Sequence, residues 1–227
     1  FGLPLLQRVV ATEPATSGAV RGLVLAPTRE LSLQVTDALR DMARGVDGIR
    51  LVTVYGGASY TPQLKALSRG VPIVVGTPGR VKDLVERGAL DLSALELFIL
   101  DEADEMLRMG FIDDVQALLE QAPDGRQIAL FSATMPREIQ AIADRFQVEP
   151  ASVQVESRGL QVDHITQCAI LVPQHQKLDA LLRLLKGPIR GTTLVFARTR
   201  AGCAEVADGL LDRGVAADAL HGDLAQA

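Results

Sequence analysis

The segment Phe98-Ile99-Leu100-Asp101-Glu102-Ala103-Asp104 decides the fold class of this chain. The segment begins within a continuous apolar run, Leu97 to Leu100, which is the pattern of a strand buried on both faces of a parallel sheet. Three carboxylates within four residues follow this run. Because ligands of open α/β sheets bind outside the carboxyl ends of the strands, Asp101 and Glu102 are expected at a ligand site.

The two acids have a chemical and a structural interpretation. An aspartate that ends a buried strand holds Mg²⁺ in P-loop nucleotide hydrolases, so Asp101 is a candidate ligand of that ion. Glu102 is then placed to accept a proton from an attacking water. The same acids would also suit a helix N-terminus, where they complement the helix dipole. On this segment alone the two interpretations are equally good.

Short apolar runs alternate with amphipathic segments along the first two thirds of the chain. The expected strands are 22–26, 50–55, 72–76, 95–100, 127–131 and 152–155. The expected helices are 30–42, 63–68, 81–86, 111–120 and 138–146. This alternation is typical of βαβ units, whose right-handed crossovers place helices on both faces of a parallel sheet.

The pattern lapses at the polar residues 156–161 and then resumes. Beyond this point we expect strands at 164–172, 193–197 and 216–220, and helices at 177–185 and 201–212. The sequence therefore predicts a first domain at residues 1–156, a linker at 157–163 and a truncated second α/β domain at 164–227. The chain begins inside an apolar segment and stops after a polar turn, so we expect a fragment of a longer protein.

Composition narrows the class of protein. Hydrophobic residues make up 48% and charged residues 22%, which is ordinary for a globular protein. A net charge of −5 argues against indiscriminate binding to nucleic acid, although it leaves room for a local binding groove. No apolar run approaches the length of a membrane span, so we expect no membrane association. Two cysteines far apart in the sequence favour a reduced, cytoplasmic setting.

A small polar or glycine-rich cluster follows most of the expected strands. Threonines such as Thr28 and Thr77 can hydrogen-bond phosphate oxygens, and helix N-termini bind anions through free N–H groups. The pair Gly56-Gly57 lets a backbone approach a ligand closely. Each cluster, taken alone, also fits a helix cap or a turn. Their occurrence together, in this order, favours function.

These clusters resemble the ordered motifs of the DEAD-box RNA helicases. The matching segments of the first domain are Pro27-Thr28-Arg29-Glu30-Leu31, Gly56-Gly57, Thr77-Pro78-Gly79-Arg80, Asp101-Glu102-Ala103-Asp104 and Ser132-Ala133-Thr134. Leu194 to Arg200 and Leu220 to Leu224 are similar to segments of the family's second domain. The resemblance implies an α/β fold, with a RecA-like parallel sheet covered by helices on both faces and a truncated second RecA-like domain.

The resemblance also implies roles. Asp101 would hold Mg²⁺ through water, Glu102 would activate the hydrolytic water, and Asp104 would link this motif to Ser132 and Thr134. The RNA backbone would be contacted by Thr28, Arg29, Gly56, Gly57, Thr77, Gly79 and Arg80 of the first domain and by Arg198, Thr199 and Gly222 of the second. Such contacts position a strand without reading its sequence. The implied ligands are ATP, Mg²⁺ and RNA.

One departure from the family pattern is important. The chain contains no G-x-x-x-x-G-K-[ST] segment, and the family's adenine-binding glutamine motif and arginine-finger motifs are also missing. We therefore expect an ATP-dependent RNA helicase when the protein is whole and an inactive fragment when this chain stands alone. The alternative is a non-catalytic RNA-binding or scaffold protein that retains the fold.

Overall fold

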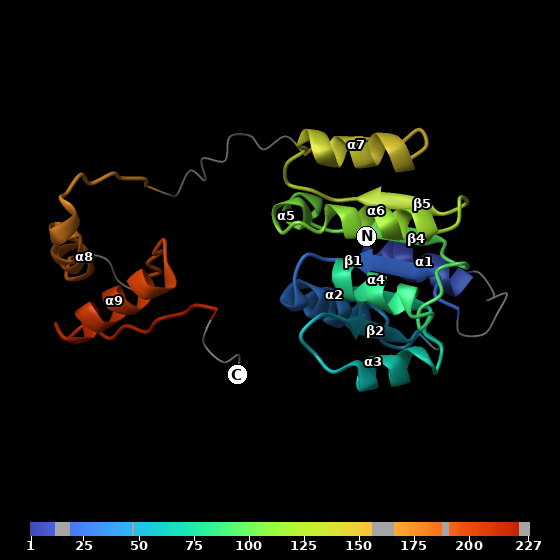
Figure 1. Ribbon diagram of the computed structural model, residues 1–227, viewed down its shortest axis with the longest axis horizontal. Helices are drawn as coiled ribbons and strands as arrows, with labels where there is room; N and C mark the ends of the chain where they lie inside the picture. The colour runs from blue at the N-terminus through green and yellow to red at the C-terminus, as the bar shows by residue number, and fades with distance from the viewer. Residues whose placement is uncertain (12–18, 47, 156–165, 188–190, 223–227) are drawn as a thin grey trace. The chain divides into compact units, whose positions relative to one another are not determined.

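The computed structural model describes residues 1–11, 19–46, 48–155, 166–187 and 191–222 (Figure 1). The chain forms two compact units, Phe1–Val153 and Gln154–Ala227. The predicted linker, 157–163, lies outside the described residues, so the predicted domain boundaries stay a prediction.

The first unit is built on a sheet of five strands in the order β2-β3-β1-β4-β5. Its strands are β1 (Gly22–Leu25), β2 (Leu51–Val54), β3 (Ile73–Gly76), β4 (Leu97–Leu100) and β5 (Gln127–Leu130). Every neighbouring pair is parallel, which confirms the predicted sheet. The chain leaves β1 toward β2 and leaves β4 toward β5, on opposite sides, so β1 and β4 form a topological switch point.

Helices cover both faces of this sheet (Figure 1). One face packs against α1 (Gly2–Ala11) and α2 (Arg29–Met42). The other packs against α3 (Tyr60–Leu67), α4 (Pro78–Glu86), α5 (Ala103–Arg108), α6 (Ile112–Gln121) and α7 (Arg137–Phe146). Neighbouring residues of β1 join different cores, Leu23 with the α3–α7 side and Val24 with the α1–α2 side, because successive strand side chains point to opposite faces.

The α1 helix is a feature that the strand and helix pattern did not predict. Buried Arg21 anchors its C-terminal end, donating from Nη1 to the carbonyl of Val9 (2.8 Å) and pairing through Nε with Glu96 (2.6 Å). The helix also packs tightly on β1, since a Cβ at Gly22 would lie 2.4 Å from Leu5. The apolar segment at the start of the chain is therefore part of the core.

The second unit contains the two predicted helices, as α8 (Lys177–Leu185) and α9 (Arg200–Leu211), with a short 3₁₀ turn, η1 (Gln174–Gln176), before α8. Strands were predicted at 164–172, 193–197 and 216–220, and at 152–155 in the linking region. The described residues of these segments form no strand, so these predictions are wrong there. A strand requires a hydrogen-bonded neighbouring strand, and the described residues of these runs have none; Leu171 and Phe196 are 99% and 93% exposed.

No helix in the described part of the chain has the length and apolar character needed to cross a membrane.

Candidate functional site

The candidate site lies along the carboxyl edge of the sheet. The strands end in register, with Leu25 opposite both Gly76 and Leu100, and Leu100 opposite Leu130. The residues that follow each strand therefore gather on one edge, as the sequence predicted. The Asp101 N–H extends the ladder by donating to the Leu25 carbonyl at 3.0 Å, which fixes the acidic segment beside the end of β1.

Asp101 and Glu102 differ in their surroundings. Asp101 is half-buried, and burial raises the pKa of its carboxyl although a hydrogen bond from the Glu102 backbone opposes this. Glu102 is exposed and turns the chain from β4 into α5 with φ 55° and ψ 54°, the left-handed region that residues other than glycine rarely adopt. Its side chain makes no hydrogen bond as a helix cap. The acids do stand at a helix N-terminus, where they can complement the helix dipole, and the chemical role of Glu102 stays a prediction.

Asp104 connects the acidic segment to the loop after β5. Its carboxylate accepts hydrogen bonds from the Thr134 hydroxyl (2.7 Å) and the Thr134 N–H (3.0 Å). The Asp104 N–H donates to the Ser132 hydroxyl (3.1 Å), which in turn donates to the Thr134 carbonyl (2.6 Å). Burial raises the pKa of Asp104, but hydrogen bonds from Thr134 and Ser132 outweigh this and lower it. The two loops are joined as one unit.

The carboxylates fit the coordination of a single magnesium ion shared with a phosphate ligand. Mg²⁺ is usually bound by one or two carboxylates together with waters and substrate phosphates. Asp101 forms no ion pair with any residue that the structure describes, so its half-buried carboxylate can serve such a cation. Within the described ranges, no group of three or more His, Cys, Asp or Glu side chains forms a metal site by itself.

The predicted RNA-contacting residues of the first unit lie on the same edge. Thr28 caps α2, its hydroxyl accepting from the Leu31 N–H at 3.1 Å, and the exposed Arg29 lies over the Tyr55 ring, 4.9 Å from its centroid. Thr77 stands at the N-terminus of α4, where its hydroxyl makes no capping bond. Gly79 follows in the first turn of that helix.

The glycine pair and Arg80 form a separate feature of this edge. Gly56 and Gly57 are exposed, and Gly57 has a φ of 76°. Arg80 is only 8% exposed, lies 3.9 Å from the Tyr60 ring centroid and donates to the Ala58 carbonyl at 3.0 Å. The buried Arg80 side chain therefore fixes the glycine loop through its hydrogen bond to the Ala58 carbonyl. Tyr60 was missed from the sequence, where its position three residues after Gly57 was the only signal.

The second unit gathers its predicted residues near the start of α9. Thr199 caps this helix by accepting from the Gly202 N–H at 3.0 Å, and Arg198 precedes it as an exposed side chain. Gly222 lies beside the Arg200 guanidinium, since a Cβ there would be 3.8 Å from it. The site residues of each unit thus cluster within that unit.

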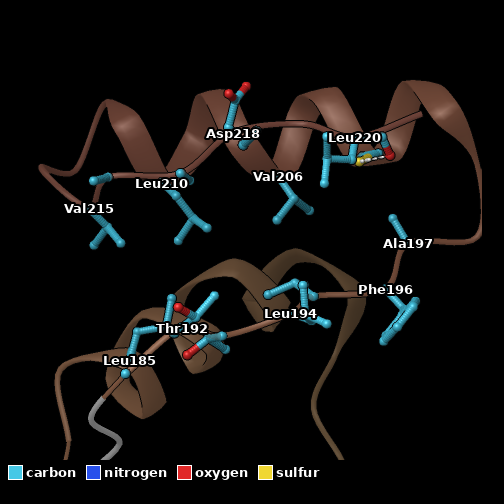
Figure 2. Close-up of a pocket in the computed structure, with 17 residues that line it drawn as sticks. Leu185, Thr192, Leu194, Phe196, Ala197, Val206, Leu210, Val215, Asp218 and Leu220 are labelled. Carbon is cyan, nitrogen blue, oxygen red and sulfur yellow. Dashed lines mark hydrogen bonds between the residues drawn. The ribbon is translucent and has the colours of Figure 1, made fainter. Parts of the chain in front are cut away.

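A cavity of about 690 Å³ in the second unit has a different character. Figure 2 shows Val206 and Leu210 of α9 pointing toward Leu194 and Leu185 across it. The lining is mainly aliphatic and includes none of the predicted site residues. We interpret this cavity as a loosely packed core between α9 and the segments 191–197 and 215–220, which form no strand.

The chain resembles known proteins over its full length. The family model for DEAD/DEAH box helicase matches residues 1–142. The ATP-dependent RNA helicase DeaD of Escherichia coli is 46% identical over all 227 residues, and the DEAD-box ATP-dependent RNA helicase CshA of Geobacillus kaustophilus is 43% identical. The chain spans 36% and 48% of these two relatives.

A solved structure agrees with these matches. The crystal structure of a DEAD box protein from the hyperthermophile Methanococcus jannaschii has a TM-score of 0.64 and 39% sequence identity, covering 99% of this chain and 59% of that one. The motif order, the fold and the matched relatives together show that the chain belongs to the DEAD/DEAH box helicase family.

Proposed function

We propose that the protein containing this chain is an ATP-dependent RNA helicase, which couples ATP hydrolysis to RNA binding and to local separation of RNA duplexes. The observation that carries this proposal is the hydrogen-bonded unit formed by Asp104 with Ser132 and Thr134, directly beside the strand-ending Asp101. It links the acids suited to nucleotide chemistry to a second loop at the sheet edge. Relatives with this chain's sequence pattern are named ATP-dependent RNA helicases.

The acidic residues take distinct roles in this proposal. Asp101 would hold Mg²⁺ through water, and the ion would neutralise charge on the ATP phosphates. Glu102 is exposed and carries no capping bond, so its carboxylate is available to take the proton of the attacking water. Asp104 would transmit changes at the nucleotide to the loop that contains Ser132 and Thr134.

The RNA-binding face would be the row of loops that follows β1, β2 and β3. Arg29 would pair with a phosphate, and the N-terminal turns of α2 and α4, with Thr28, Thr77 and Gly79, would donate to phosphate oxygens. Arg198, Thr199 and Gly222 would contribute the same kind of contact from the second unit. These contacts address the backbone, so the RNA sequence would not be read.

The setting of the protein follows from the same proposal. Cys168 and Cys203 are both free thiols, which supports a reducing, cytoplasmic location.

The test is ATP hydrolysis by the full-length protein, measured with and without single-stranded RNA. We expect hydrolysis that RNA stimulates and that DNA of the same sequence stimulates less, together with ATP-dependent separation of a short RNA duplex. Residues 1–227 alone contain no G-x-x-x-x-G-K-[ST] segment to hold the phosphates, so they should not hydrolyse ATP. RNA binding without any hydrolysis by the full-length protein would support the scaffold alternative instead.

A further inference from the structure

The loop between β2 and α3, residues 55–59, is tied to the protein through its carbonyl groups. Gln63 donates from Nε2 to the Tyr55 carbonyl (3.3 Å) and to the Ser59 carbonyl (3.2 Å), on either side of the glycine pair. Arg80 donates from Nη2 to the Ala58 carbonyl (3.0 Å). Both side chains are buried, with exposed fractions of 6% for Gln63 and 8% for Arg80.

The amide groups of the same loop are left available. Among the described residues, the N–H groups of Gly56, Gly57 and Ala58 have no hydrogen-bond acceptor. Both glycines are exposed, and Gly57 takes a φ of 76° that a side chain would strain. A loop in which the carbonyls of Tyr55, Ala58 and Ser59 accept from buried side chains while consecutive N–H groups stay free is suited to an anion.

Tyr60 fixes the cation that holds this loop. The Arg80 guanidinium lies 3.9 Å from the centre of the Tyr60 ring, and the Arg87 guanidinium lies 5.0 Å from it. Arg87 also pairs with Asp83 at 2.7 Å. Because a cation over an aromatic face is attracted by the ring, Tyr60 limits the positions that the Arg80 side chain can take.

We propose that Tyr60 and Gln63, with Arg80, are positioning residues that preorganise the Gly56–Ala58 amides to bind an RNA phosphate. This inference rests on the proposed RNA-binding function and assigns Arg80 a supporting role in place of the direct RNA contact expected from the sequence. The uncharged side chains Tyr60 and Gln63 contribute by fixing the loop, so removing either should weaken binding without removing an ionic contact.

The experiment measures binding of a fluorescein-labelled oligouridine to the 227-residue chain by anisotropy, across a range of salt concentrations. Tyr60→Leu, which removes the ring, and Gln63→Met, which removes the amide, should each weaken binding about fivefold, the effect of losing one hydrogen bond or a cation–π contact. The slope of log Kd against log salt should stay that of the unmodified chain, because the number of phosphate contacts is unchanged.

Two variants serve as controls. Tyr60→Phe keeps the ring and should restore binding. Gln121→Met makes the same chemical change at an exposed helix position where the amide only meets the Ala117 carbonyl, and it should bind as the unmodified chain does. All measurements are made under conditions in which circular dichroism shows that each variant is folded. A weaker binding then reports a change in the position of the Gly56–Ala58 loop and not unfolding of the chain.

The outcomes distinguish this inference from the function on which it rests. If the unmodified chain binds RNA and Tyr60→Leu and Gln63→Met bind equally well, the positioning role is wrong and the proposed function stands. A reduced salt slope in these variants would also overturn the positioning role, since it would mean that a phosphate contact was lost. If the unmodified chain binds no RNA, the proposed RNA-binding face fails, and this inference fails with it.

Discussion

Glu102, the proposed base, has an unfavourable backbone conformation. The left-handed conformation costs a residue with a side chain about 1 kcal/mol or more relative to its ordinary conformations, and glycine avoids this cost. The loops around Asp104 hold Glu102 in this conformation, since the Ala103 N–H donates to the Phe131 carbonyl at 3.0 Å. Strain of this kind concentrates at functional sites.

We therefore predict that Glu102→Gly is more stable to unfolding than Glu102→Ala, by about 1 kcal/mol. The matched control is Glu138, an exposed residue in the first turn of α7, where glycine should be the less stable of the two replacements. Urea denaturation of the four variants measures this difference. If the alanine variant were more stable than the glycine variant at both positions, the strain argument would be contradicted.

The second prediction concerns the pH dependence of the stability that Asp104 contributes. Its pKa in the folded chain is below the ordinary value of 3.8, because the hydrogen bonds from Thr134 and Ser132 outweigh burial. A lowered pKa means that its contribution to stability is complete above pH 3.8 and is lost as the pH falls through the folded-state pKa. Asp104→Asn should therefore cost about 1–2 kcal/mol at neutral pH and progressively less below pH 3.8.

Denaturation of both proteins over a range of pH checks this. A difference in stability that stays constant from neutral pH to the acid range would show that the Asp104 charge does not take part.

Single residues were predicted well where a local pattern determines their place. Asp101 follows a buried strand, so the sequence placed it at the sheet edge, where the structure has it. Arg80 was harder, because a basic residue in a glycine-rich loop resembles a phosphate ligand. Its burial depends on Tyr60, which belongs to another helix, and no local pattern shows that contact.

At the scale of elements, the loop after β5 and the start of α5 form a single coupled structure. Replacing both Ser132 and Thr134 with alanine removes both hydroxyl groups that join it to Asp104. In the full-length protein this double variant should retain ATP hydrolysis and lose most duplex unwinding. The control Thr134→Ser keeps a hydroxyl and should retain more of both activities than the double alanine variant does. A proportional fall of hydrolysis and unwinding in the double variant would exclude the coupling role.

The five strands of the first unit follow from its sequence because apolar runs and turn residues mark each of them, whereas the helix α5 was not among the predicted ranges. The segments 193–197 and 216–220 were also predicted as strands but form none, since a strand exists only with a neighbouring strand to bond. The α1 helix was missed because its apolar residues alone do not reveal that they fit between α2 and β1.

At the scale of the whole molecule, the two units differ in the core that each one has. The first unit has extensive buried cores on both faces of its sheet, whereas the buried apolar residues in the described part of the second are Leu182, Ala207 and Leu210. Stability rises with the surface that a unit buries. The second unit should therefore be the less stable one.

Hydrogen exchange of the 227-residue chain tests this difference. We expect the amides of α8 and α9 to exchange well before those of β1 and β4, as local unfolding of the second unit requires less free energy. Equal protection of the two units would mean that the second unit gains stability from a source other than its own core.

The acidic segment at the end of β4 is proposed to perform nucleotide hydrolysis in a protein that acts on RNA. The most direct measurement is ATP hydrolysis by the full-length protein carrying Glu102→Gln, compared with its binding of ATP and RNA. Loss of the base alone should reduce hydrolysis by at least about a hundredfold while both ligands still bind. Hydrolysis within a few-fold of the unmodified protein would contradict the assignment of Glu102 as the base and the proposed hydrolytic function of the acidic segment.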